Sequence, residues 1–139
     1  FNVSEALIRG GELTLGKSFG EWNTRLAMSY VDPRNLETDD VLSDRSRGTV
    51  DVSVDRRWGD FSWAKQWHAQ SERINYDGLA GQDRKLGGFN TVAMKASYQI
   101  SESLSMALKV NNLFDKEYQT RHQFRTDGRN ATLSLRYGF

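Results

Sequence analysis

The last ten residues of the chain, from Asn130 to Phe139, alternate between polar and apolar side chains. Successive side chains of a β-strand point to opposite faces, so this segment would have one polar and one apolar face. The apolar set is Ala131, Leu133, Leu135, Tyr137 and Phe139. The pattern predicts a strand between lipid and water in a membrane barrel, or a half-buried strand of a soluble antiparallel sheet. The terminal phenylalanine favours the barrel, because bacterial outer-membrane barrels commonly end on an aromatic residue.

The same alternation recurs along the chain and predicts about seven strands. They lie near residues 5–19, 22–31, 46–57, 61–71, 88–100, 104–112 and 129–139. Tight turns at 20–21, 58–60 and 101–103 alternate with long polar connections at 32–45, 72–87 and 113–128, so all tight turns fall at one end. Short periplasmic turns and long extracellular loops are typical of outer-membrane barrels. We therefore predict an all-β fold, a transmembrane antiparallel β-barrel to which this chain contributes about seven strands.

The predicted strands carry their apolar residues on one face. The expected outward set is Leu13, Leu15, Phe19, Trp22, Leu26, Met28, Tyr30, Val50, Val52, Val54, Phe61, Trp63, Trp67, Val92, Met94, Ala96, Tyr98, Ile100, Leu104, Met106, Leu108 and Val110. Aromatic residues concentrate near the tight turns, as Phe19, Trp22, Trp58, Phe61, Trp63, Tyr98, Tyr137 and Phe139, which predicts an aromatic girdle at the periplasmic interface. A soluble sandwich would need a second apolar face to cover the first, and the pattern offers none.

Two lysines do not fit the apolar face. Lys17 and Lys65 fall on outward positions by strict alternation. Lys17 lies close to a turn, from which a lysine can extend its ammonium group into water. For Lys65 we expect a local bulge or an inward rotation of the strand. Lys65 also favours the alternative of a soluble all-β binding module.

Composition changes this picture little. The chain has 139 residues, 27% of them charged, and a mean hydropathy of −0.68. No apolar run approaches the roughly 20 residues of a membrane helix, whereas a spanning strand needs only about 9–11 residues. The 19 basic and 18 acidic residues nearly balance, so no nucleic-acid partner is expected. Cysteine is absent, which excludes disulfides and thiolate chemistry.

Three segments resemble TonB-dependent outer-membrane receptors. They are Asn2 to Glu12 with its Gly-x-Glu ending, Lys109 to Tyr118 with its Asn-Leu-Phe-Asp-Lys motif, and the closing segment Gly128 to Phe139. The resemblance implies a 22-stranded barrel around a plug domain, with a TonB box before the plug. Residues 1–139 would then be the C-terminal portion of such a barrel in the bacterial outer membrane, in contact with lipid. The plug, the early strands and the contact with TonB would lie in the rest of the receptor, on the same or a companion chain.

Within that family, three segments look most like the cobalamin receptors: 30–35, 60–63 and 124–129. This resemblance implies active transport of a large scarce nutrient, a cobalamin or other corrinoid, with a siderophore or haem as the alternative. The candidate substrate contacts on the loops are Arg45, Arg47, Tyr76, His122, Phe124 and Arg125. Arg45 and Phe124 occupy positions where cobalamin receptors place an arginine and a tyrosine near the ligand. Each candidate could also be an ordinary solvated loop residue.

The sequence gives little indication of a metal site, a haem site or a catalytic site. The Asn-Leu-Phe-Asp motif has a structural interpretation, in which Leu113 and Phe114 fold against the rim and Asp115 caps the following turn. His68 and His122 are the only histidines, too few for a metal or haem site without further ligands. The acidic segment 32–44 lacks the spacing of an EF-hand calcium loop. We expect no cofactor and no enzyme, although an outer-membrane barrel enzyme with catalytic residues at its rim remains an alternative.

Overall fold

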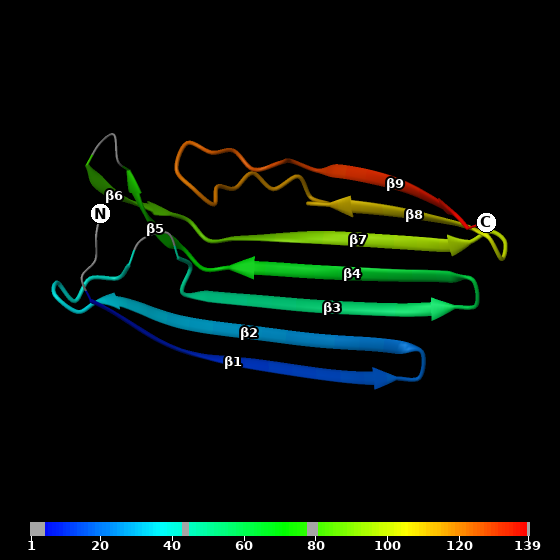
Figure 1. Ribbon diagram of the computed structural model, residues 1–139, viewed down its shortest axis with the longest axis horizontal. Coiled ribbons are helices and arrows are strands. Elements are labelled where there is room, and N and C mark those ends of the chain that lie inside the picture. Colours follow the sequence, from blue (N-terminus) through cyan, green and yellow to red (C-terminus); the bar gives the residue numbers. More distant parts are fainter. Residues whose placement is uncertain (1–4, 43–44, 78–80, 139) are drawn as a thin grey trace.

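The computed structural model describes residues 5–42, 45–77 and 81–138, and these residues form nine β-strands (Figure 1). The strands are β1 (Ala6–Phe19), β2 (Trp22–Asn35), β3 (Gly48–Trp58), β4 (Phe61–Gln70), β5 (Arg73–Asp77), β6 (Gln82–Leu86), β7 (Phe89–Gln99), β8 (Leu104–Asn111) and β9 (Asn130–Tyr137). Seven of them form one antiparallel sheet in the order β1-β2-β3-β4-β7-β8-β9, and β5 pairs with β6. The all-β prediction and all seven predicted strands are confirmed. No helix among the described residues is long and apolar enough to cross a membrane.

Tight turns lie together at one end of the sheet (Figure 1). Phe19 pairs with Trp22 and Trp58 pairs with Phe61, so each of these hairpins turns through only two residues. Gly20 and Gly59 occupy these turns with φ of +60° and +54°, values that suit glycine because it has no Cβ. The long connections lie at the other end, where residues 71–88 include the β5–β6 hairpin. The two ends of the sheet therefore differ as the sequence predicted.

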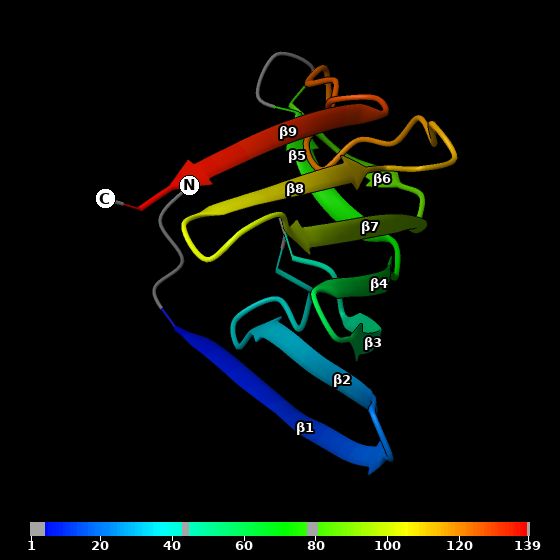
Figure 2. The ribbon, with the colours of Figure 1, turned by 90° about the vertical axis from the view of Figure 1, so that its right-hand side faces the viewer.

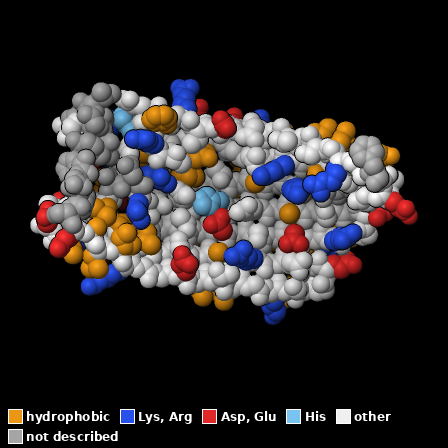
Figure 3. All heavy atoms as spheres, viewed as in Figure 1, with side chains coloured by type: hydrophobic (Ala, Val, Ile, Leu, Met, Phe, Trp, Pro, Cys, Tyr) orange, Lys and Arg blue, Asp and Glu red, His pale blue; other side chains and the backbone are white. Residues whose placement is uncertain are grey.

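Viewed along its strands, the large sheet is curved like part of a cylinder wall (Figure 2). Polar side chains line the concave face (Figure 3), where they form hydrogen bonds across the strands. The hydroxyl oxygens of Ser29 and Thr49 form a hydrogen bond of 2.6 Å. The side-chain amide of Asn23 donates to the Asp55 carboxylate at 2.9 Å. His68 Nδ1 lies 2.8 Å from Asp51 Oδ1. These bonds hold the polar groups of neighbouring strands in register on a face that suits water.

The apolar set occupies the convex face, where many of its members are exposed. Leu15 is 54% exposed, Leu108 45% and Leu135 67%. Among the described residues, the buried apolar side chains are Pro33, Phe89 and Val92, and of these only Val92 belongs to the apolar set. A soluble sheet would bury such a face against a second layer, because exposed apolar area costs about 25 cal/mol per Å². The sheet therefore has the two faces of a barrel wall, with no core of its own.

Lys65 remains on the apolar face. Pairing between β3 and β4 runs without interruption from Thr49–Gln70 to Trp58–Phe61, so Lys65 shares a face with Trp63 and Trp67. The bulge or inward rotation that we expected for Lys65 is therefore wrong. Lys17 is closer to its turn, and its ammonium nitrogen lies 4.7 Å from the centre of the Phe19 ring.

The aromatic residues near the tight turns contact one another. The Trp22 ring meets Trp58 edge-on at 5.9 Å and Trp63 at 6.4 Å, while Trp58 stacks on Phe61 at 5.8 Å. The Arg56 guanidinium lies 4.5 Å from the centre of the Trp58 ring. Amphipathic rings and cations of this kind are typical of a membrane interface. Phe139, also predicted for this girdle, lies outside the described residues.

The Asn-Leu-Phe-Asp motif organises the start of the last loop. Asn112 is 6% exposed and exchanges two hydrogen bonds of 2.9 Å with the backbone of Lys116. Asp115 accepts a hydrogen bond of 2.7 Å from the backbone N–H of Arg129, next to the start of β9. Asp115 therefore links the two ends of the loop instead of capping the following turn. Phe114 is 73% exposed, so our expectation that it packs against the rim is also wrong.

Candidate binding site at the loop ends of the strands

The last loop packs against the β5–β6 hairpin. Asn75, which is 2% exposed in β5, accepts a hydrogen bond of 2.8 Å from the backbone N–H of His122. Arg73 donates to the carbonyl oxygen of Thr120 at 3.1 Å. Two connections that are far apart in the sequence therefore form one structured surface at the loop end.

A cavity of about 560 Å³ opens on the concave face at this end, and we call it the loop-end cavity. It is lined by Thr91, Ala93, Asn111, Asn112, Tyr118, Arg125, Thr126, Asp127 and Asn130. The strand residues among them lie on the concave face of β7, β8 and β9. Amides, hydroxyls, one guanidinium and one carboxylate suit a polar ligand that both donates and accepts hydrogen bonds.

Three aromatic rings lie next to the loop-end cavity. Phe89, at the start of β7, stacks on Tyr118 with ring centres 4.0 Å apart. The His68 ring of the neighbouring strand lies 6.3 Å from the Phe89 ring. Tyr118 is thereby fixed by packing while it also lines the loop-end cavity, so it is held in place before any ligand binds.

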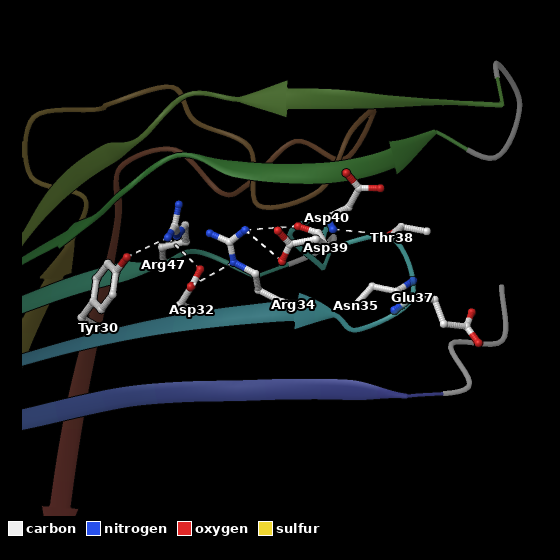
Figure 4. A network of polar contacts seen from close by, with 9 residues as sticks. All are labelled: Tyr30, Asp32, Arg34, Asn35, Glu37, Thr38, Asp39, Asp40 and Arg47. Atoms are coloured by element: carbon white, nitrogen blue, oxygen red, sulfur yellow. Dashed lines mark hydrogen bonds and ion pairs between the residues drawn. The ribbon is translucent and has the colours of Figure 1, made fainter.

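A second polar cluster lies at the loop ends of β2 and β3 (Figure 4). Arg47 donates to the Tyr30 hydroxyl and to Asp32, both at 2.7 Å. Arg34 donates to the same Asp32 carboxylate at 3.1 Å and lies 3.4 Å from Asp39. Tyr30 belongs to the apolar set of β2, and the uninterrupted pairing of β1 with β2 places Asp32 and Arg34 on the same face. This cluster therefore stabilises the outer side of the rim.

Arg47 also borders a smaller cavity of about 300 Å³ between the β2–β3 connection and the β5–β6 hairpin. Its lining is Val41, Arg45, Arg47, Glu72, Arg73, Ile74, Asp83 and Lys85. Lys85 and Glu72 form an ion pair of 2.7 Å. Four basic side chains against two acidic ones leave the cavity cationic.

The structure does not bring the six predicted contacts into one site. Arg45 and Arg47 line the smaller cavity, whereas Arg125 lines the loop-end cavity on the concave face. His122 lies beside β5, and Phe124 is 62% exposed with the Arg121 guanidinium 5.6 Å from its ring centre. Tyr76 lies in β5 opposite Asp83, and its side chain is outside the described part of the structure.

Sequence reasoning missed several lining residues. Tyr118 and Thr126 line the loop-end cavity, and Arg73 and Lys85 line the smaller one. Tyr118 lies three residues after the Asn-Leu-Phe-Asp motif, and its closeness to that motif in the sequence could have indicated it. No feature of the sequence indicated Arg73 and Lys85, because the two residues come together only through the pairing of β5 with β6.

The described residues do not form a cluster of candidate metal ligands. No group of three or more His, Asp or Glu side chains among them is placed to hold a metal ion. His68 is bonded to Asp51 in the wall, and His122 lies on the last loop, so the two histidines belong to different clusters.

Comparison with protein families gives one match. The family model "TonB dependent receptor-like, beta-barrel" matches residues 1–113.

Several solved structures share the fold. The chain is 22% identical to a protein described as "Copper transporter OprC", with a TM-score of 0.82 over 96% of this chain and 23% of that one. It is 24% identical to a mutant of the ferric enterobactin receptor PfeA of Pseudomonas aeruginosa, with a TM-score of 0.83 over 99% of this chain and 23% of that one. It is 20% identical to the ferripyoverdine receptor of the outer membrane of Pseudomonas aeruginosa, with a TM-score of 0.79 over 95% of this chain and 19% of that one. The chain thus spans about a fifth to a quarter of the length of these proteins.

Proposed function

The chain belongs to the family of TonB-dependent receptor-like β-barrels, and from that premise we propose that it forms part of the wall and the outer loops of an outer-membrane transport receptor. The observation that carries this proposal is the division of the sheet into an exposed apolar convex face and a hydrogen-bonded polar concave face. Such a wall separates lipid from an aqueous lumen. Its role would be to bind and admit a nutrient without covalent chemistry.

The proposal includes partners that complete the barrel. β1 and β9 are the two edges of the large sheet, and each has one side without a partner strand among the described residues. Unpaired strand edges expose N–H and C=O groups that cannot be satisfied by lipid. Residues 1–139 would therefore act as the C-terminal portion of a barrel, with early strands, plug domain and TonB contact supplied by the rest of the receptor.

For the substrate we propose a large polar nutrient that enters from the loop end, with a corrinoid as the first candidate. The resemblance of three segments to cobalamin receptors supports the corrinoid. The names of the structural neighbours, which include receptors for ferric enterobactin and ferripyoverdine, support a ferric siderophore equally well. Both kinds of ligand present many hydrogen-bonding groups on a bulky body, which matches the lining of the loop-end cavity.

Arg125 is the side chain that we expect to contribute most to binding, because it is the guanidinium in the loop-end cavity. The other candidates are Arg45, Arg47, Tyr76, His122 and Phe124. Arg47 already donates to Tyr30 and Asp32, so it would act mainly by holding the rim.

The test starts from outer membranes of cells that produce the receptor containing this chain. Detergent-solubilised receptor is titrated with cyanocobalamin, ferric enterobactin and ferric pyoverdine. We expect one of the three to be retained, and Arg125→Ala to weaken its binding at least about tenfold, since a hydrogen bond from a charged group contributes about 1.5–3 kcal/mol. The matched control is Lys116→Ala, because the hydrogen bonds at this loop residue are made by its backbone.

Two results would contradict the proposal. The first is recovery of the chain in a form that stays soluble without detergent and does not sediment with outer membranes. The second is equal ligand affinity for the parent protein, Arg125→Ala and Lys116→Ala, which would remove the loop-end cavity from the binding site.

A further inference from the structure

The last loop, residues 112–129 between β8 and β9, is closed at its base by hydrogen bonds of the Asn-Leu-Phe-Asp motif. The backbone N–H of Asp115 donates to the carbonyl oxygen of Asn112 at 2.9 Å. The Asp115 carboxylate reaches across the loop and accepts the backbone N–H of Arg129 at 2.7 Å. We call Asp115, Gly128 and Arg129 the loop clamp.

The loop clamp leaves no room for a side chain at Gly128. A Cβ added there would lie 2.8 Å from Asp115 Oδ1, and no atom outside Asp115 would lie within 4 Å of it. Asp115 has a φ of +54°, a left-handed conformation that aspartate and asparagine adopt more readily than most residues. The contact between the two ends of the loop therefore depends on the residue type at both positions.

The stretch held by the loop clamp carries part of the lining of the loop-end cavity. Arg125, Thr126 and Asp127 come directly before Gly128, and all three line that cavity. The Thr126 hydroxyl donates to the carbonyl oxygen of Tyr118 at 2.7 Å, which ties this stretch to the opposite side of the loop. Within the described part of the chain, Arg125 and Asp127 form no ion pair or side-chain hydrogen bond. Their charged groups are therefore available to a ligand.

The side-chain amides of the same lining already take part in hydrogen bonds within the protein. Asn111 donates to the side-chain oxygen of Asn130 at 2.9 Å, and Asn130 donates to the loop backbone at 3.0 Å. The Asn112 amide is bonded to the loop backbone through both its nitrogen and its oxygen. The charged contacts to a ligand must then come from the loop, because Arg125 and Asp127 are the charged residues of the lining.

We propose that Asp115 is a positioning residue for ligand binding, and that the loop clamp holds Arg125 and Asp127 over the loop-end cavity before the ligand arrives. Asp115 does not line the cavity, so it acts only through the loop. Binding then requires little further ordering of these two side chains, which raises affinity. This role rests on the proposed function, and it gives the Asn-Leu-Phe-Asp motif a part in binding that its own side chains do not show.

The first test needs no ligand. Backbone hydrogen exchange of residues 119–128 is compared in the detergent-solubilised receptor that contains this chain. Asp115→Gly suits the positive φ and removes only the carboxylate, so we expect it to speed this exchange at least about tenfold while β8 and β9 stay protected. Asp115→Asn keeps an acceptor oxygen and should behave like the parent protein. Glu117→Gly, which removes an exposed carboxylate from the same loop, is the matched control and should leave exchange unchanged.

The second test measures affinity for whichever of cyanocobalamin, ferric enterobactin and ferric pyoverdine the parent receptor retains. Asp115→Gly should weaken binding about five- to tenfold, because two long or charged side chains must then be ordered on binding. Asp115→Asn should restore most of the affinity. In a receptor that already carries Arg125→Ala and Asp127→Ala, Asp115→Gly should change affinity less than about twofold, since the groups through which it acts are gone.

Gly128 provides an independent variant of the same clamp. Gly128→Ala should weaken binding and speed exchange much as Asp115→Gly does, because the new methyl group displaces the carboxylate. Added to Asp115→Gly, it should have no further effect, since the atoms that it would meet are absent. Additive losses in the double variant would separate the two positions and contradict a shared clamp.

Two further results would overturn the inference. One is unchanged exchange of residues 119–128 in Asp115→Gly. The other is an affinity loss from Asp115→Gly that persists in full without the Arg125 and Asp127 side chains, which would make Asp115 a residue of general stability. A parent receptor that retains none of the three compounds counts against the proposed function, whereas the exchange comparison decides the loop clamp in either case.

Discussion

Single residues decide which face of this sheet can meet lipid. Alternation of side chains was enough to assign nearly every position of the seven long strands, because each side chain points away from its neighbours. Lys65 is the exception. We expected a bulge or a rotation of the backbone at this residue, but β3 and β4 pair regularly past it. A long flexible side chain can extend toward an interface at less cost than a broken ladder of hydrogen bonds.

Lys65 gives the first prediction. Lys65→Leu should raise the free energy of unfolding of the receptor in lipid vesicles by about 1–2 kcal/mol, because a lysine on the lipid face costs about 2–4 kcal/mol at the midplane and less near an interface. The measurement is guanidinium-induced unfolding followed by tryptophan fluorescence. Lys17→Leu is the matched comparison and should have a smaller effect, since Lys17 already lies beside Phe19 near a turn. If Lys65→Leu were destabilising, the convex face would not face lipid at that depth.

Asp32 gives the second prediction. It accepts hydrogen bonds from both Arg34 and Arg47, so Asp32→Ala leaves two guanidinium groups close together without their shared partner. We expect a loss of about 1–2 kcal/mol in the free energy of unfolding, the usual range for removing an acceptor from partly buried charged donors. The loss should be larger in low salt. Asp39→Ala, at a carboxylate that is 87% exposed, should have no measurable effect. Equal effects of the two variants would show that the cluster does not stabilise the rim.

At the scale of elements, the sequence predicted the long strands and missed the short hairpin. β5 and β6 have five residues each and carry mostly polar or charged side chains, so their alternation lacks an apolar partner. No lipid or core imposes a pattern on strands that lie among the loops, and their formation depends on pairing with each other. The roles of Phe114 and Asp115 could not be predicted from neighbouring residues either. Asp115 accepts a hydrogen bond from the backbone of Arg129, fourteen residues away.

Close packing of β1 against β2 gives the third prediction. A Cβ added at Gly10 would lie 2.5 Å from the Tyr30 carbonyl oxygen, whereas a Cβ at Gly11 would meet no atom within 4 Å. Gly10→Ala should therefore force the two strands apart and lower the free energy of unfolding by about 1–3 kcal/mol. Gly11→Ala, at the next position of the same strand, should be neutral. Both are compared by unfolding and by amide hydrogen exchange of β1. Equal exchange in the two variants would contradict the pairing seen here.

At the scale of the whole molecule, the chain is a curved wall whose stability depends on its surroundings. Many of its apolar side chains are exposed and its two edge strands lack outer partners among the described residues, so we expect lipid and neighbouring strands to supply much of the free energy of folding. The alternation of polar and apolar residues predicted this architecture, because each long strand shows that alternation along its own sequence. It could not predict that Arg45 and Arg125 line different cavities, because loop conformation depends on contacts such as that between Asn75 and His122.

The central claim is that the convex face meets lipid, and the absence of cysteine allows a direct test. Single cysteines at Ser105, Met106, Ala107 and Leu108 of β8 would carry nitroxide labels in the receptor reconstituted into vesicles. We predict that collision with membrane-dissolved oxygen alternates along the strand, high at 106 and 108 and low at 105 and 107. Free access of a water-soluble nickel complex to positions 106 and 108, or the absence of alternation, would contradict the account.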